Sequence, residues 1–150
     1  CIRDRGKEFY QKFDLVKSLF KEADKILEIP ISKIILEGPE DQLKLTQNTQ
    51  PAIFLISCSI YKVIKEEFNI NLNAAKFFAG HSLGEYTALA SSNKISLKDC
   101  SNILKKRGDL MNSSVIPNST GMAALIGCDA KSISKIKEGN RRRSVHKEIR

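Results

Sequence analysis

A serine held between two glycines, after an apolar run and before a helix-forming run, constrains the fold of this chain more than any other feature. Residues 77–92 read FFAGHSLGEYTALASS, and residues 80–84 within them fit the pattern G-x-S-x-G. In that pattern a strand turns sharply into a helix, so that the serine backbone is strained and its hydroxyl is exposed. The flanking glycines let neighbouring backbone approach without a clash against a Cβ atom. This context favours a nucleophile elbow at Ser82 over a structural turn that happens to contain a serine.

Hydrophobic spacing predicts helices on both sides of the elbow. The first helix is amphipathic and ends before Pro30, and a connection with short turns follows it. Pro51 suits the first turn of the next helix, because a missing N–H does no harm there. The sequence SLKD at 96–99 resembles a capping box that opens a later helix. The predicted helices span residues 8–28, 49–68, 85–92 and 96–113, and another begins in residues 129–139.

Two short apolar runs predict strands. They are AKFFA at 75–79, which we expect to be buried, and GMAALIG at 121–127. The order helix, helix, strand, elbow, helix, helix is typical of an α/β protein built on a sheet. After Gly139 the sequence has no usable hydrophobic period. That end is either a solvated basic segment or a foreign or frame-altered sequence.

Charge, hydropathy and cysteine spacing exclude several function classes. Of the formal net charge of +8, residues 141–150 carry +4, and no aromatic residues interleave there to stack on bases, so we expect no nucleic-acid partner. No apolar run approaches the ~18 residues of a membrane span. The cysteines at positions 1, 58, 100 and 128 have no C-x-x-C spacing and no histidine cluster near them, so we expect no metal site. Scattered thiols without a secretion signal suit a reducing cytoplasm.

Arg107 lies on an apolar stripe of its predicted helix. It is four residues after Ile103, three after Leu104 and four before Met111. An arginine there either extends its head group out to solvent along its stem or pairs with a buried anion, because an unpaired buried guanidinium is costly. Its planar fork suits a carboxylate held by two hydrogen bonds. The spacing alone leaves both interpretations open.

A general base for Ser82 is harder to identify. The chain has two histidines, and one of them, His146, lies in the basic end without a pattern. His81 is adjacent to Ser82, and neighbouring side chains do not face one another at a strand end, so we expect His81 to shape a pocket wall. Without a base, a serine hydroxyl is a weak nucleophile at neutral pH.

Several segments together resemble one known family. GHSLGEYTALA is similar to the nucleophile segment of malonyl-CoA:acyl carrier protein transacylases. NTQPAIF at 48–54 resembles the segment with a pocket glutamine, which falls on Gln50, and KKRGDLM at 105–111 resembles the segment with the carboxylate-binding arginine, which falls on Arg107. The resemblance covers roughly residues 6–138. An esterase would share G-x-S-x-G but not the glutamine and arginine segments.

The resemblance implies a fold and a division of the chain. Residues 1–117 would form an incomplete α/β-hydrolase-like acyltransferase core. Residues 118–139 would begin a small ferredoxin-like subdomain, and residues 140–150 would be a basic tail. The resemblance also implies a cytoplasmic enzyme of fatty-acid biosynthesis that needs no cofactor and no metal.

The resemblance further implies a mechanism. Ser82 would attack the thioester of malonyl-CoA, and the malonyl group would then pass to the thiol of acyl carrier protein. The backbone N–H of Leu83 would donate to the oxyanion. Arg107 would bind the malonyl carboxylate, Gln50 would line the acyl pocket, and His81 would belong to its wall.

The chain also departs from the family pattern. The family begins with a Gly-Gln-Gly-Ser-Gln loop that supplies a second oxyanion donor, and CIRDR does not match it. Its base histidine lies farther beyond the nucleophile than the 68 residues that follow Ser82 here. We therefore expect a piece of about half the enzyme, with little activity of its own. The alternatives are a serine esterase of the α/β-hydrolase type and a non-catalytic truncated or degenerate product.

Overall fold

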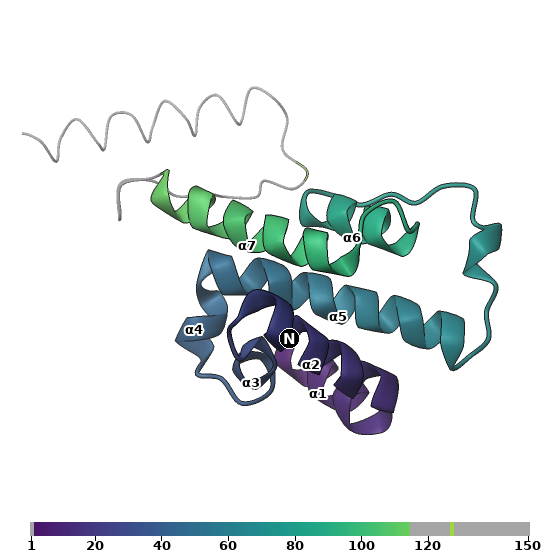
Figure 1. Ribbon diagram of the computed structural model, residues 1–150, viewed down its shortest axis with the longest axis horizontal. Helices are drawn as coiled ribbons and strands as arrows, with labels where there is room; N and C mark the ends of the chain where they lie inside the picture. Colours follow the sequence, from purple (N-terminus) through teal and green to yellow (C-terminus); the bar gives the residue numbers. More distant parts are fainter. Residues whose placement is uncertain (1, 115–126, 128–150) are drawn as a thin grey trace, which may run out of the picture. The chain divides into compact units, whose positions relative to one another are not determined.

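The computed structural model of the chain describes residues 2–114 and residue 127 (Figure 1). The chain divides into two compact units, Cys1–Val115 and Ile116–Arg150, and all the helices described belong to the first unit. The strand predicted at 121–127 and the helix predicted from 129 lie outside the described residues, apart from Gly127. The elements described are α1 (Ile2–Lys12), α2 (Asp14–Leu27), α3 (Ile31–Leu36), α4 (Glu40–Lys44), α5 (Thr46–Glu66), the 3-10 helix η1 (Leu72–Ala74), α6 (Leu83–Ser91) and α7 (Leu97–Ser113).

The helix predicted over 8–28 is two helices that meet at Phe13. Phe13 has extended backbone angles, φ −124° and ψ 122°, and its ring lies 5.7 Å from that of Phe9 and 6.3 Å from that of Phe68. Asp14 then places a carboxylate in the first turn of α2, where it interacts favourably with the helix dipole. The prediction was wrong about continuity, since the extended Phe13, which contacts the distant Phe68, separates two helices. It was right about the end, since α2 stops at Leu27.

The connection predicted over 30–49 contains α3 and α4, and α5 begins at Thr46. Pro51 therefore lies inside α5 and not in its first turn, which corrects the prediction. Side chains of the first turn bond backbone carbonyls upstream. Asn48 Nδ2 donates to the Gln42 carbonyl at 2.8 Å, and Thr49 Oγ1 donates to the Leu45 carbonyl at 3.0 Å. These bonds stabilise the start of α5, which precedes Pro51 in the sequence.

Helix α5 is the central element of the unit and lies between two hydrophobic clusters. In Figure 1 it runs between α6 and α7 on one side and α1, α2 and α3 on the other. The larger cluster joins α5 to α2 and α3 and includes the fully buried Phe20 and Ile31. The smaller cluster holds α6 and α7 against α5. Its buried residues are Phe54, Cys58, Cys100 and Leu104, with Leu83, Tyr86 and Ala90 packed against them.

The strand predicted at 75–79 is not formed. Residues 75–80 belong to no ladder, the chain bends at Lys76, and Phe77 is 87% exposed. A strand needs a hydrogen-bonded neighbour, and the described part of the chain offers no second strand. Within residues 2–114 the fold is thus all helical, and the prediction of a buried strand there was wrong.

The helices that follow the elbow agree with the prediction. Helix α6 (predicted over 85–92) starts two residues earlier, at Leu83, and ends one residue earlier, at Ser91. Helix α7 begins after Ser96, whose Oγ accepts from the Asp99 amide at 3.0 Å and donates to the Asp99 carboxylate at 2.6 Å. The N-cap inferred from SLKD is therefore confirmed.

Candidate functional site

Ser82 lies at a sharp turn directly before α6. Its backbone angles are φ 53° and ψ −110°, a conformation that is strained for any residue with a Cβ atom. The Ser82 side chain makes no capping bond to α6, although it occupies the N-cap position. The turn is closed by backbone bonds, from the Gly84 amide to the His81 carbonyl at 2.8 Å and from the Glu85 amide to the Ser82 carbonyl at 3.2 Å. This geometry leaves the hydroxyl available to other partners, as G-x-S-x-G indicates.

The two glycines of the pattern have different roles. A Cβ added to Gly80 would lie 2.0 Å from both the carbonyl carbon and the oxygen of Gly84, so only glycine fits there. A Cβ added to Gly84 would meet no described atom within 4 Å. The prediction that both glycines permit a close approach is therefore right for Gly80, while nothing among the described residues requires Gly84.

Arg107 connects the elbow to α5. Its Nη2 donates to Ser82 Oγ at 3.1 Å, and its Nη1 donates to Gln50 Oε1 at 2.5 Å. Gln50 is only 6% exposed, and its Nε2 in turn donates to Met111 Sδ at 3.3 Å. Three residues predicted for the site, from α5, the elbow and α7, thus form one hydrogen-bonded group.

The guanidinium of Arg107 has no carboxylate in ion-pair range among the described residues. It is half-buried and points toward Ser82 and Gln50 instead of extending to solvent along its stem. A cation held beside the serine hydroxyl with two neutral partners retains its capacity to bind an anion. The arrangement therefore favours the anion-binding alternative over the solvent-exposed one.

The apolar stripe predicted on α7 is partly wrong. Cys100 and Leu104 are fully buried, but Ile103 is 41% and Met111 is 45% exposed. The buried face instead includes Gly108, where an added Cβ would lie 2.5 Å from Gln47 Cα. This close approach brings α7 against the start of α5, next to Arg107 and Gln50. The contact at Gly108 was not predicted, although the glycine directly after Arg107 in KKRGDLM was a visible signal.

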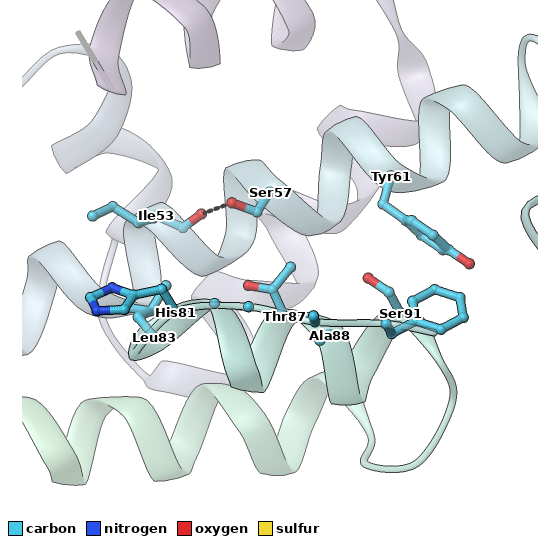
Figure 2. A pocket seen from close by; sticks show the side chains of 12 residues that line it. Ile53, Ser57, Tyr61, His81, Leu83, Thr87, Ala88 and Ser91 are labelled. Carbon is cyan, nitrogen blue, oxygen red and sulfur yellow. Dashed lines mark hydrogen bonds between the residues drawn. The ribbon is translucent and has the colours of Figure 1, made fainter. Parts of the chain in front are cut away.

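The His81 side chain makes no described hydrogen bond to this group. It is exposed and lines an open, mostly apolar hollow of about 490 Å³ between α5 and α6. Figure 2 shows His81 and Ile53 at one end of the hollow, and Tyr61 at the other. His81 thus occupies a pocket wall, but no described hydrogen bond joins it to Ser82.

Three further features of the described residues bear on metal binding, thiol reactivity and membrane insertion. Within residues 2–114 no group of three His, Cys, Asp or Glu side chains could hold a metal ion. Cys58 and Cys100 are buried free thiols, and burial raises the pKa of Cys58 to about 12. None of the helices described here combines the length and the apolar character that crossing a membrane requires.

Comparisons with known proteins bear on the same residues. A family model described as acyl transferase domain matches residues 5–140. The malonyl CoA-acyl carrier protein transacylase of Bacillus subtilis (strain 168) is 39% identical over 140 residues, which are 90% of this chain and 43% of that protein. The crystal structure of acyl-carrier-protein-S-malonyltransferase from Bartonella henselae aligns with a TM-score of 0.79 at 41% identity, over 89% of this chain and 42% of that one.

A third similarity is to a malonyl-transacylase solved in complex with its type II PKS acyl-carrier protein. The alignment has a TM-score of 0.65 at 34% identity and covers 71% of this chain and 34% of that chain. This chain therefore spans less than half the length of these relatives. Its helices have the arrangement that malonyltransferases show over the matched part. With a family model matched over residues 5–140, the chain belongs to the acyl transferase domain family.

Proposed function

We propose that this chain carries the serine side of a site that transfers a malonyl group from malonyl-CoA to acyl carrier protein in fatty-acid biosynthesis. The observation that carries the proposal is Arg107, which donates to both Ser82 Oγ and Gln50 Oε1. The names of the matched relatives support this choice of acyl group and acceptor.

In the proposed first step, Ser82 Oγ attacks the thioester carbonyl of malonyl-CoA. The C–S bond breaks, CoA leaves as the thiol, and a malonyl ester forms on Ser82. The negative charge that develops on the carbonyl oxygen is stabilised by the backbone N–H of Leu83. That amide is the first of α6 and has no partner within the helix. In the second step the thiol of acyl carrier protein attacks the ester, and Ser82 is regenerated.

Arg107 would select the acyl group. A malonyl ester on Ser82 has its free carboxylate one methylene beyond the ester carbon, so the carboxylate lies within reach of a guanidinium 3.1 Å from Ser82 Oγ. A bidentate arginine–carboxylate pair is among the stronger polar interactions in proteins. Gln50 holds Arg107 in place and lines the acyl pocket, and His81 contributes to the wall beyond it. Acetyl groups, which lack the carboxylate, gain nothing from Arg107.

We expect the chain alone to turn over slowly. His81 is the only histidine among the described residues, and no described bond joins it to Ser82. A serine without a base is poorly activated. We also propose that residues 118–139 begin a ferredoxin-like subdomain, and the division of the chain after Val115 supports this boundary. The buried free thiols at Cys58 and Cys100 support a reducing, cytoplasmic setting.

The test is acylation of the chain by malonyl-CoA, followed by intact mass over hours. We expect a malonyl adduct that Ser82→Ala abolishes. Arg107→Ala should lower malonyl labelling far more than acetyl labelling from acetyl-CoA. The esterase alternative would be favoured if Arg107→Ala lowered malonyl and acetyl labelling equally. It would also be favoured if the chain hydrolysed neutral esters rapidly and Arg107→Ala left that rate unchanged. Binding of acyl carrier protein without any adduct would favour the non-catalytic one.

A further inference from the structure

The thioether of Met111 belongs to the hydrogen-bonded group at the elbow. Its Sδ accepts from Gln50 Nε2 at 3.3 Å, and Gln50 Oε1 accepts from Arg107, which also donates to Ser82 Oγ. Gln50 is 6% exposed, so its amide has little access to water as a replacement partner. A change at the Met111 sulfur is therefore transmitted through Gln50 to the guanidinium.

The same methionine is accessible from solvent. Met111 is 45% exposed, and it lines an apolar hollow of about 500 Å³ on α7 together with the exposed Ile103 and Leu110. Arg107 borders the same hollow, one helical turn before Met111. The thioether of methionine is soft and polarizable, and oxidants convert it into a sulfoxide. A small oxidant can thus reach a side chain that is bonded to the site.

The described cysteines compete poorly for such an oxidant. Cys58 and Cys100 are both buried, and burial raises the pKa of Cys58 to about 12. A peroxide attacks the thiolate, which is scarce at neutral pH when the pKa is raised. A thioether reacts through a lone pair and needs no ionisation. Within residues 2–114, Met111 is therefore the sulfur that a peroxide reaches most readily.

We propose that Met111 is a modification site, at which oxidation by a peroxide lowers the preference of the site for malonyl groups. The Sδ lone pair attacks one peroxide oxygen, an S–O bond forms as the O–O bond breaks, and the proton on the transferred oxygen passes to the leaving one. The sulfur loses two electrons, and the peroxide is reduced by two, to water or an alcohol. This inference rests on the proposed malonyl site and concerns its regulation.

A sulfoxide cannot simply take the place of the thioether. Gln50 Nε2 and Met111 Sδ are 3.3 Å apart, which is too short to hold an S–O bond and an N–H···O hydrogen bond of about 2.9 Å in line. Oxygen added to the other lone pair leaves the sulfur electron-poor, and the buried amide then has no good acceptor. For either epimer, Met111 or Gln50 must move.

Arg107 is the donor that the new oxygen meets. Arg107 and Met111 are four residues apart on α7, so their side chains are neighbours on its surface. A guanidinium has five N–H donors, and its positive charge makes its bond to a sulfoxide oxygen stronger than one from a neutral amide. An oxygen held there occupies donors that the malonyl carboxylate needs. An acetyl group has no carboxylate and loses nothing.

The experiment uses the full 150-residue chain with Met122→Leu, which leaves Met111 as its only methionine. Peroxide treatment followed by a thiol reductant should leave one added oxygen, which peptide mass spectrometry should locate on Met111. Malonyl labelling of Ser82 should then fall about tenfold or more, while acetyl labelling changes less than about twofold. The two methionine sulfoxide reductases, one for each epimer, should restore malonyl labelling.

Matched variants separate the added oxygen from the loss of the thioether. Met111→Leu has no sulfur to oxidise, so peroxide should not alter its ratio of malonyl to acetyl labelling. Met111→Gln carries a carbonyl oxygen at a similar position along the side chain. Without any peroxide, Met111→Gln should therefore have a lower ratio than Met111→Leu. Circular dichroism of both variants checks that the helices remain.

A spectroscopic signature reports on the same change without acyl transfer. In proton–nitrogen NMR spectra, the side-chain signals of Gln50 Nε2 and Arg107 Nε should both shift when Met111 is oxidised. Gln50→Leu and Arg107→Met assign these signals by removing them. If the unoxidised chain takes up no malonyl group, the proposed function fails, and the NMR shifts still decide whether oxidation of Met111 disturbs Arg107.

Three results would overturn the proposal. The first is that Met111 stays unoxidised at a peroxide concentration that oxidises free methionine. The second is a Met111 sulfoxide that leaves the malonyl-to-acetyl ratio or the Arg107 signal unchanged. The third is an equal loss of malonyl labelling in Met111→Leu after peroxide treatment, because the sensitive group would then lie elsewhere in the chain.

Discussion

Gly108 on α7 lies against the backbone of Gln47 at the start of α5, so closely that a Cβ atom at Gly108 would be 2.5 Å from Gln47 Cα. The same Cβ would be 2.8 Å from the Thr46 carbonyl oxygen. Both neighbours are backbone atoms, which cannot rotate away as a flexible side chain could. This contact sets the separation of the two helices beside Arg107 and Gln50, and it therefore determines whether the guanidinium reaches the amide oxygen.

Gly108→Ala should destabilise the fold, although alanine is the better helix former. In an open helix the substitution would stabilise by up to about 1 kcal/mol. Here the added methyl group must push α5 and α7 apart, and overpacking of this kind costs about 1–3 kcal/mol. Urea unfolding of both proteins measures the difference. Asn112→Ala, an exposed change on the same helix, is the control and should be neutral or slightly stabilising. Equal or greater stability of Gly108→Ala would contradict the prediction.

The glycines of G-x-S-x-G should respond in opposite ways. Gly80→Ala places a Cβ 2.0 Å from the Gly84 carbonyl, so the first turn of α6 or the elbow must move. We expect a loss of stability and of any acylation at Ser82. Gly84→Ala has open space around its Cβ and lies in the first turn of a helix, so it should be neutral or stabilising by up to about 1 kcal/mol. Thermal unfolding and intact mass after malonyl-CoA treatment measure both effects. Similar behaviour of the two variants would show that the elbow does not depend on this contact.

Local signals were enough to predict the elbow and the helices around it. G-x-S-x-G requires a residue with positive φ, and Ser82 has φ 53°. SLKD contains the side chain that caps its own helix, so the start of α7 depends only on residues within four positions of each other. The group formed by Gln50, Ser82 and Arg107 needed the family resemblance, because its members are up to 57 positions apart.

The features that were missed depend on distant neighbours. AKFFA has the composition of a strand, but a strand is completed by a partner that no residue within AKFFA specifies. Phe13 interrupts a helical pattern, and its ring contacts that of Phe68, which is more than fifty positions away. The role of Gly108 is set by the distance between α5 and α7, which a single helix pattern cannot reveal.

Cys58 should make stability fall with rising pH. Burial raises its pKa from 9.0 to about 12 in the folded chain. Above pH 9 the unfolded chain therefore loses this proton first, binds fewer protons than the folded chain, and becomes relatively more stable. The free energy of unfolding should decrease between pH 9 and pH 12, by at most about 1.4 kcal/mol per pH unit from this thiol. Well below pH 9 the thiol is protonated in both states and contributes no pH dependence.

Comparison with Cys58→Ala isolates this effect from the lysines and tyrosines that titrate in the same range. Urea unfolding at pH 7.5, 9 and 10.5 should show a steeper decline for the wild-type chain than for the variant. The native thiol should also react slowly with a disulfide reagent at pH 7.5 and quickly after unfolding in urea. Parallel declines of the two proteins would show that Cys58 ionises as readily in the folded chain as in the unfolded one.

Arg107 and Gln50 should be energetically coupled. Gln50 is 6% exposed, so removing the Arg107 fork leaves the buried Gln50 Oε1 without its donor, at a cost of about 1–3 kcal/mol. Gln50→Leu removes the acceptor and leaves Arg107 with Ser82 Oγ alone. Because both single changes break the same bond, Arg107→Met with Gln50→Leu should cost less than the sum of the two. A double-mutant cycle measured by urea unfolding should give a coupling of about 0.5–3 kcal/mol. If the changes in unfolding free energy were simply additive, the guanidinium would be held by Ser82 and by its own packing. Gln50 could then contact a substrate without repositioning Arg107.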